Sequence, residues 1–235
     1  MVKTELIKRS PLRILERSLH GGLKPGEIGV LTGKKGIGKT ACLVHVATDK
    51  LFRGKHVIHI SYAPNVHHLI DWYEDIFKEI ARKRNLENAM DVHEEIIRNR
   101  VILNFHKEGA KTSHVVATLR ALKEGGAFDV DQVIVDGYEF TTVDPHEFAL
   151  FKEVAEDLGI SFWFSASTGE EAPEVDEGSF PVLLDPVKDM LDVVLLLLPG
   201  KDGVTLHLVK DRDRLGDTDL HLVLDPKTLL ISEED

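Results

Sequence analysis

Eight consecutive residues, from Gly33 to Thr40, have the types and spacing that bind phosphate. They satisfy the phosphate-loop pattern G-x-x-x-x-G-K-[ST]. Glycines let such a loop turn its backbone N–H groups toward phosphate oxygens, because no side chain blocks the necessary conformations. In this pattern Lys39 is expected to bind the β- and γ-phosphates, and the Thr40 hydroxyl to coordinate the Mg²⁺ that a nucleotide carries. The residues predicted to contact the nucleotide are Gly33, Lys34, Lys35, Gly36, Ile37, Gly38, Lys39, Thr40 and Ala41.

The segments on either side of the loop favour this interpretation. A short apolar run at 28–31 predicts a buried strand before the loop. After the loop, helical spacing relates the apolar or small residues Ala41, Val44, Ala47 and Leu51. A helix that begins near Gly38 would add its positive end to the anion site. The alternative is a glycine-rich turn with an incidental lysine, and the order of strand, loop and helix favours the phosphate loop.

Asp136 is the second residue predicted to bind Mg²⁺. It ends the apolar run 133–135, which is typical of a buried strand. An acid at this place fits the position that holds Mg²⁺, usually through a water, in phosphate-loop enzymes. Its carboxylate is costly to bury unless a cation or hydrogen-bond donors lie nearby. The alternative is an aspartate that only caps the next turn.

Two basic residues near the C-terminus, Lys210 and Arg212, are a further candidate. They follow a strand-like segment at 204–209, and residues two apart on a strand point the same way. Such a pair can contact a phosphate bound by a neighbouring subunit. The alternative is a solvated turn whose charges neutralise one another, since the segment 210–214 alternates basic and acidic residues.

The histidines of the predicted strand at 56–62 and of the predicted helix at 64–83 form no predicted metal site. His56 and His59 would point to opposite faces of a regular strand, and His67 and His68 diverge around a helix. Cys42 is the single cysteine, and no H-E-x-x-H pattern is present. A structural zinc ion is therefore not expected.

Composition limits the class of protein. The 235 residues, of which 43% are hydrophobic, suit a single domain, 1–235, with a lead-in segment at 1–20. One cysteine fits a reducing, cytoplasmic compartment. The N-terminus lacks the apolar core of a signal peptide, and no apolar run is long enough to span a membrane. A net charge of −11 argues against a general binder of nucleic acid or of anionic membranes.

Strand-like runs alternate with segments of helical periodicity along most of the chain. The predicted strands are 28–31, 56–62, 101–105, 132–136 and 160–165, and the predicted helices include 64–83, 91–98, 112–123 and 145–158. Ser10 is expected to cap a first helix, and Thr112 or Ser113 the helix at 112–123. After residue 191 come three strand-like segments, 192–198, 204–209 and 220–224, with a short end at 229–231. These patterns predict an α/β fold: a mainly parallel sheet with helices on both faces, extended by antiparallel C-terminal strands.

These features together resemble the RecA superfamily of phosphate-loop ATPases, most closely KaiC-like and replicative-helicase-type domains. The resemblance covers nearly the whole chain. The matching pieces are 22–27, the loop 33–40, the helix end 51–55, Asp136, and the pair Lys210 and Arg212. The resemblance implies a RecA-like fold, ATP with Mg²⁺, and assembly into rings or filaments. It also implies that Lys210 and Arg212 reach the γ-phosphate of the next subunit, and that Ser167 or Thr168 lies near the position that senses it.

Two departures from that family bear on function. The family has a glutamate at the end of the second strand that polarises the attacking water, whereas no acid stands near Tyr62 and Ala63 here. A general base contributes roughly 10²–10⁴-fold to a rate. The loop after the fifth strand, which contacts DNA in recombinases and helicases, is acidic here, with Glu170, Glu171, Glu174, Asp176 and Glu177. Acidic residues repel nucleic-acid phosphates, so DNA binding through this loop is not expected.

The sequence therefore predicts a protein that binds Mg-ATP tightly and hydrolyses it slowly or not at all. ATP would then act as a switch for homo-oligomer assembly or for a regulatory protein partner. One alternative is an active ATPase in DNA recombination, repair or helicase-type work that recruits its base elsewhere. Another is a small-molecule kinase, which would need an arginine-rich lid that the acidic loop does not supply.

Overall fold

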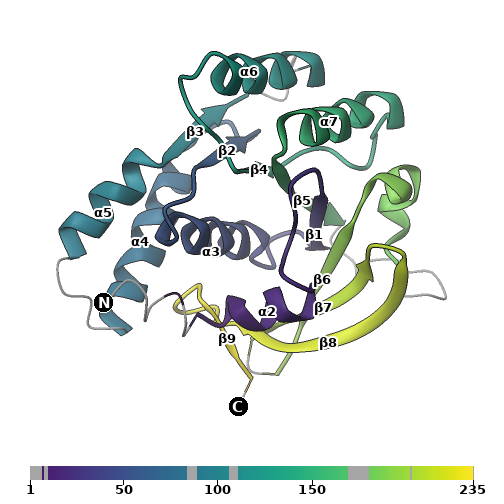
Figure 1. The fold of residues 1–235 in the computed structure, drawn as a ribbon. Helices are drawn as coiled ribbons and strands as arrows, with labels where there is room; N and C mark the ends of the chain where they lie inside the picture. Colours follow the sequence, from purple (N-terminus) through teal and green to yellow (C-terminus); the bar gives the residue numbers. More distant parts are fainter. Residues whose placement is uncertain are drawn as a thin grey trace.

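The computed structural model describes residue 7 and residues 10–83, 89–105, 111–168, 180–201 and 203–234. The described residues form one nine-stranded sheet in the order β3-β2-β4-β5-β1-β6-β7-β8-β9 (Figure 1). Its strands are β1 (Ile28–Lys34), β2 (Val57–Ser61), β3 (Arg100–Asn104), β4 (Gln132–Asp136), β5 (Ser161–Thr168), β6 (Val193–Pro199), β7 (Val204–Asp211), β8 (Arg214–Leu224) and β9 (Ile231–Glu233). The predicted acidic loop, with its acids from Glu170 to Glu177, lies outside the described residues, as does most of 1–9.

The sheet has a parallel part and an antiparallel part. Every pairing from β3 across to β6 is parallel, and β7, β8 and β9 then pair antiparallel. The α/β class and the antiparallel C-terminal strands are therefore confirmed. The prediction that all the strands after residue 191 are antiparallel is wrong for β6, which pairs parallel with β1. Because β6 is connected to β5 by η1, it can return to the sheet in the parallel direction.

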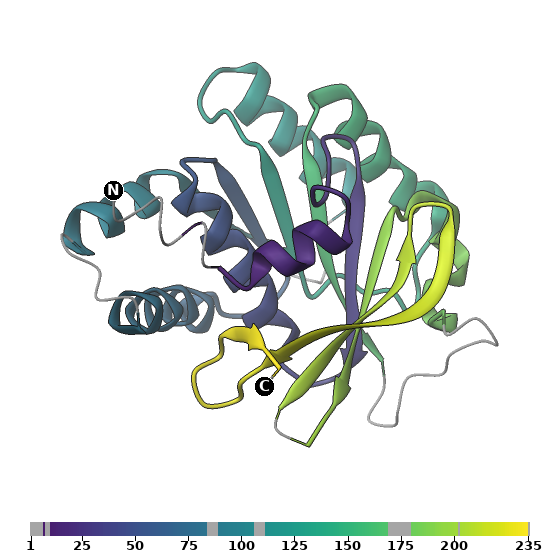
Figure 2. The same ribbon diagram turned by 60° about the horizontal axis from the view of Figure 1, so that its bottom comes forward.

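Helices cover both faces of the sheet (Figure 2). One face carries α2 (Leu12–Ser18), α3 (Lys39–Phe52), α4 (His67–Lys83) and α5 (Ala89–Arg98), and the other carries α6 (Thr112–Glu124), α7 (Pro145–Leu158) and the 3₁₀ helix η1 (Val182–Met190). Along β2, Val57 packs in the α3 layer while Ile58 and Ile60 pack in the α7 layer. Both faces of β1, β2, β4, β5 and β6 are thus largely buried, which explains their near-continuous apolar runs, whereas the edge strand β3 is half-buried.

The ends of the helices follow local signals only in part. The Asp144 carboxylate accepts a hydrogen bond from the His146 N–H (2.9 Å) at the start of α7, and Gly159 ends that helix at φ +60°. The predicted caps at Ser10 and at Thr112 or Ser113 are wrong, because α2 and α6 have no side-chain cap. The Ser10 hydroxyl bonds to Asp49 instead, so a residue of another helix replaces the local partner.

A buried histidine on α3 makes stability depend on pH. The His45 side chain is buried, its Nδ1 accepts a hydrogen bond from the Ile231 N–H (3.0 Å), and burial lowers the pKa of His45 to about 4. The unfolded chain binds the proton near its ordinary pKa, so stability falls as pH drops from about 6.5 toward 4. We expect the titration of His45 alone to lower the free energy of unfolding by about 2 kcal/mol between pH 7 and pH 5. Urea unfolding at the two pH values measures this change.

The control for this loss is His45→Asn, whose amide oxygen can accept from the same backbone N–H but does not titrate. The variant should lose about 2 kcal/mol less than the wild type over that pH range. Equal losses in the two proteins would contradict the assignment.

None of the described helices has both the length and the apolar character needed to cross a membrane.

Candidate nucleotide-binding site

The predicted phosphate loop leaves the sheet at its middle. It follows β1, which lies between β5 and β6, and it leads directly into α3. Lys34, Lys35 and Gly36 are exposed at its tip, whereas Lys39 and Ala41 are buried at the start of α3. Backbone N–H groups and the positive end of α3 are therefore available at one surface.

Gly33 is required by space as well as by conformation, and Gly38 by its conformation. Gly33 has φ +152°, and a Cβ there would lie 2.8 Å from the backbone oxygen of Leu197 on β6. Gly38 has φ +108°, and a Cβ there would lie 2.4 Å from Leu224 Cδ2. Gly36 also has a positive φ, +80°, but nothing lies within 4 Å of an added Cβ. The loop thus packs against the β6 backbone at Gly33 so closely that only glycine fits, whereas the Leu224 side chain near Gly38 can shift.

The Lys39 ammonium lies inside the loop. Nζ donates to the backbone oxygens of Gly33 (2.9 Å) and Lys34 (2.8 Å). Burial lowers the pKa of Lys39 to about 8, although the nearby Asp136 charge acts in the opposite direction. Lys39 is therefore the buried cation that a phosphate oxygen would meet, and both of its present acceptors belong to the loop itself.

This lowered pKa predicts a pH dependence of nucleotide binding. Phosphate favours the charged ammonium, so Lys39 must take up a proton to bind when the pH exceeds about 8. We expect nucleotide affinity to fall by up to about tenfold per pH unit above that value, measured by calorimetric titration from pH 7 to 9.5. Lys39→Arg remains charged throughout and should show a flat profile in this range. A flat profile for the wild type would contradict the prediction.

The two residues predicted to bind Mg²⁺ are brought together. Thr40 Oγ1 donates to Asp136 Oδ2 (2.9 Å), and Ser165 Oγ donates to Asp136 Oδ1 (2.6 Å). The Gly137 N–H donates in turn to Ser165 Oγ (2.9 Å). A hydroxyl and a carboxylate are hard oxygen ligands of the kind that Mg²⁺ prefers, so these residues fit the ion. The donors around Asp136 also explain how its carboxylate is held at the end of β4.

The end of β2 has no acid in the position that faces the site. In register, Ser61 is the neighbour of Asp136. The Tyr62 side chain belongs to the opposite core, against Phe105 and Tyr138. Of the residues at this strand end, Ser61 is therefore the one on the face of Thr40 and Asp136, and none of Ser61, Tyr62 and Ala63 is an acid. Sequence alone did not reveal this, because it depends on where β2 ends.

Arg212 has a different environment from the one expected. It follows β7 in the turn at φ +55°, so the premise that Lys210 and Arg212 point the same way along a strand is wrong. Its guanidinium donates to Glu27 Oε1 (3.0 Å) and Oε2 (2.8 Å) and to the backbone oxygens of Leu19 (3.2 Å) and Gly22 (3.0 Å). Lys210 Nζ donates to the Arg212 oxygen (2.7 Å). Contact of the pair with a neighbouring subunit stays a prediction.

The strand β5, which pairs with β1, carries Ser167 and Thr168, the residues expected near the position that senses the γ-phosphate. In register, Ser167 is the neighbour of Gly33 and Thr168 is the neighbour of Lys34. Ser165, two residues earlier, is the one that bonds to Asp136. Its position at the end of a predicted strand was the only signal in the sequence, and the pairing with Asp136 required the sheet order.

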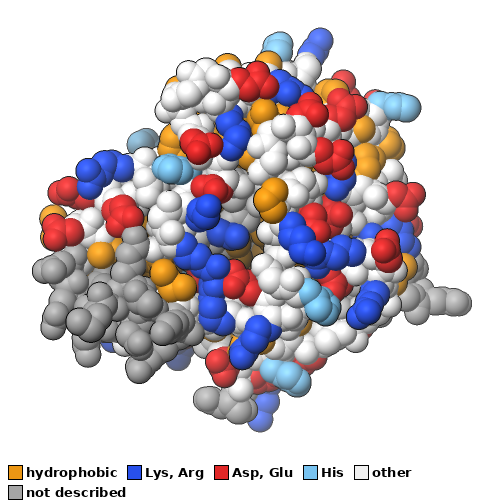
Figure 3. Space-filling view, viewed as in Figure 1, with side chains coloured by type: hydrophobic (Ala, Val, Ile, Leu, Met, Phe, Trp, Pro, Cys, Tyr) orange, Lys and Arg blue, Asp and Glu red, His pale blue; other side chains and the backbone are white. Residues whose placement is uncertain are grey.

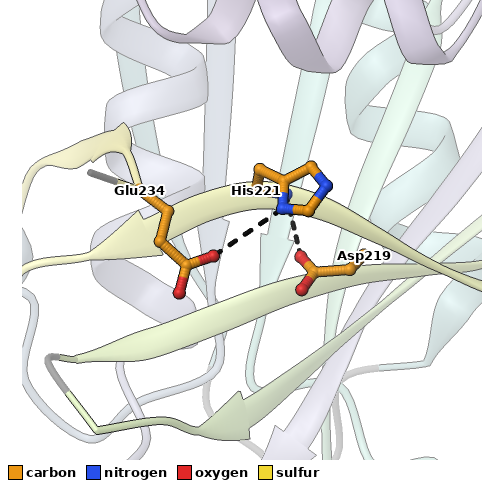
Figure 4. Close-up of side chains that lie close together, drawn as sticks. All are labelled: Asp219, His221 and Glu234. Carbon is orange, nitrogen blue, oxygen red and sulfur yellow. Dashed lines mark hydrogen bonds and ion pairs between the residues drawn. The ribbon is translucent and has the colours of Figure 1, made fainter.

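One group of potential metal ligands lies elsewhere in the described residues. Ligand atoms of Asp219, His221 and Glu234 lie within 4.8 Å of one another on β8 and just after β9 (Figure 4). The backbone N–H of His221 donates to Asp219 Oδ1 (2.8 Å), and all three side chains are exposed. Exposed acidic groups gather in this way without an ion, so we assign no metal to the group.

No model of a known protein family matches this chain, and no curated protein matches its sequence.

Proposed function

We propose that this protein is a cytoplasmic, RecA-like ATP-binding protein. The observation that carries the proposal is the phosphate loop itself, with Lys39 buried inside it and Thr40 bonded to Asp136 at its base. The loop N–H groups and Lys39 would bind the phosphates, and Thr40 and Asp136 would hold the Mg²⁺. When bound, Mg²⁺ would neutralise charge on the β- and γ-phosphates.

We further propose that hydrolysis is slow. The RecA resemblance expects a water-activating acid at the end of β2, where this chain has Ser61, Tyr62 and Ala63, and neither a serine hydroxyl nor a buried phenol accepts a proton readily at neutral pH. Burial raises the pKa of Tyr62, which keeps its phenol protonated. The bound nucleotide would then persist, which suits a ligand that controls assembly or a partner.

We propose that bound ATP controls the assembly of an oligomer. Control of a regulatory protein partner is the second possibility. Lys210 and Arg212 remain the candidates for contact with the phosphates of a neighbouring subunit. In the described chain Arg212 is bonded to Glu27, so that contact would require Arg212 to change partners. Nucleic acid is not the partner we propose, since basic and acidic side chains are interspersed over the face in Figure 3.

The test measures binding and turnover of the same purified protein. Calorimetric titration with ATP and Mg²⁺ should show binding that Lys39→Ala weakens by at least about 100-fold. Turnover should stay below about 0.1 per second, since a typical kcat is about 10 per second and a general base contributes at least about 10²-fold.

Each failure has a distinct meaning. Absence of Mg-ATP binding by the wild type would overturn the proposed function. Fast turnover that Lys39→Ala abolishes would instead identify an active ATPase, and stimulation of that turnover by DNA would favour the recombination or helicase alternative.

A further inference from the structure

His59 is a buried histidine on the sheet face that carries the nucleotide site. Its side chain is fully buried on β2, and its ring packs edge-on against Tyr73 of α4 with centroids 5.7 Å apart. Nδ1 lies 2.9 Å from the Tyr73 hydroxyl. Nε2 is buried and has no hydrogen-bond partner in the described part of the chain. An unpaired buried nitrogen is costly, so this atom calls for a partner.

The hydrogen bond to Tyr73 fixes which nitrogen carries the proton. Burial lowers the pKa of His59 to about 4 and raises that of Tyr73, so the imidazole is neutral and the phenol keeps its proton. If the phenol donates to Nδ1, the proton of the ring is on Nε2 and one buried group is left unpaired. The opposite arrangement would leave the phenol proton and Nε2 both unpaired. The first arrangement is favoured, and Nε2–H is then a buried donor.

Asp136 lies on the strand next to His59 and on the same face of the sheet. His59 pairs in register with Ile134, and Ser61 pairs with Asp136, so His59 and Asp136 lie one strand and two residues apart. Strand spacing and rise put their Cα atoms about 8 Å apart. Both side chains are on the α3 side of the sheet, since His59 bonds to α4 and Asp136 to Thr40. The Asp136 charge acts on both His59 and Tyr73.

The Asp136 carboxylate has capacity for a further bond. It accepts from Thr40 through Oδ2 and from Ser165 through Oδ1, which leaves lone pairs on both oxygens. Two polar side chains on one face of a sheet, with Cα atoms about 8 Å apart, can share one bridging water when both are buried. Residues that hydrogen-bond to a metal-binding carboxylate commonly change the affinity of the site for its ion.

We propose that His59 is a positioning residue for the Mg²⁺–nucleotide site: its Nε2–H donates to a buried water that donates to the Asp136 carboxylate. The inference rests on the proposed function, because it assigns Asp136 to Mg²⁺. Since Tyr73 fixes the tautomer of His59, the network also connects the site with α4.

Two variants separate the donor from the packing. His59→Gln places an amide nitrogen near the place of Nε2, whereas His59→Asn places it near Nδ1 and removes the donor. The experiment titrates Mg²⁺ into protein with a fluorescent ATP analogue and measures the Mg²⁺ midpoint, together with nucleotide affinity in EDTA. We expect His59→Asn to raise the midpoint by about tenfold and His59→Gln to stay near the wild type. Affinity in EDTA should not change in either variant.

A second buried histidine provides the control. His45→Asn alters a fully buried imidazole that bonds to Ile231, and it should leave the Mg²⁺ midpoint unchanged. A loss of packing alone would lower thermal stability without changing the ratio of affinities with and without Mg²⁺. Equal midpoints in His59→Asn and the wild type would overturn the inference while leaving the proposed function intact. A wild type that binds no nucleotide would overturn the proposed function instead.

Nitrogen-15 NMR of the wild-type histidine rings tests the same point without any variant. It should show the Nε2–H tautomer for His59, with a proton protected from exchange when Mg²⁺ and the ATP analogue are bound. An Nδ1–H tautomer for His59 would overturn the inference even if His59→Asn failed to fold.

Discussion

Gly33→Ala is expected to remove measurable nucleotide binding and to lower the free energy of unfolding by about 3 kcal/mol. The new Cβ would stand 2.8 Å from the Leu197 backbone oxygen, at a residue whose φ is +152°. That oxygen belongs to β6, which pairs with β1 beside the loop, so it cannot move without disturbing the sheet. Urea unfolding gives the loss of stability, and calorimetric titration with Mg-ATP gives the loss of binding.

Gly36→Ala is the matched control for this effect. Gly36 also has a positive φ, +80°, but an added Cβ meets nothing within 4 Å. Gly36→Ala should therefore lower the free energy of unfolding by the backbone strain alone, about 1–2 kcal/mol. If the two variants lose equal stability, the contact with β6 does not explain the requirement for Gly33.

Arg212→Ala is expected to lower the free energy of unfolding by about 3 kcal/mol. The guanidinium holds Glu27 through two oxygens and also binds the backbone oxygens of Leu19 and Gly22, which ties the β7–β8 turn to the segment before β1. The Arg212 and Glu27 side chains are only 22% and 15% exposed, so truncation leaves a carboxylate with little water, no cation, and only the Lys24 backbone N–H as a donor. Urea unfolding at pH 7 measures the change.

An exposed ion pair provides the comparison. Arg120 pairs with Asp157 at 34% and 58% exposure, and Arg120→Ala should cost less than about 1 kcal/mol. Glu27→Gln combined with Arg212→Ala should recover part of the loss, because a neutral amide is cheaper to leave without its partner. A loss for Arg212→Ala as small as that for Arg120→Ala would refute the structural role assigned to Arg212.

This role bears on the expected contact between subunits. Arg212 cannot keep all four of these hydrogen bonds and also reach a phosphate on another chain. The proposal of contact between subunits therefore requires that Arg212 exchange its bonds with Glu27 for bonds to the nucleotide, and that the turn move with it.

The sequence by itself determined the class of fold and the order of strand, loop and helix around Gly33 to Thr40. Gly33 to Thr40 carry their chemistry in adjacent residues, and the spacing of apolar residues fixes whether a segment forms a strand or a helix. The helix 145–158 was correct for the same reason, since Asp144 and Gly159 act within one turn of its ends.

Only the tertiary structure decided which distant residues meet. Ser165 is 29 residues from Asp136 and Arg212 is 185 from Glu27, so these pairs depend on strand order and on the path of the C-terminal turn. The same dependence made the predicted caps at Ser10 and Thr112 wrong, and it placed Ser61 rather than Tyr62 beside Asp136. Local pattern fixes the conformation of a segment, whereas the partner of a polar side chain is selected by the packing of the whole chain, where any nearby donor or acceptor competes for it.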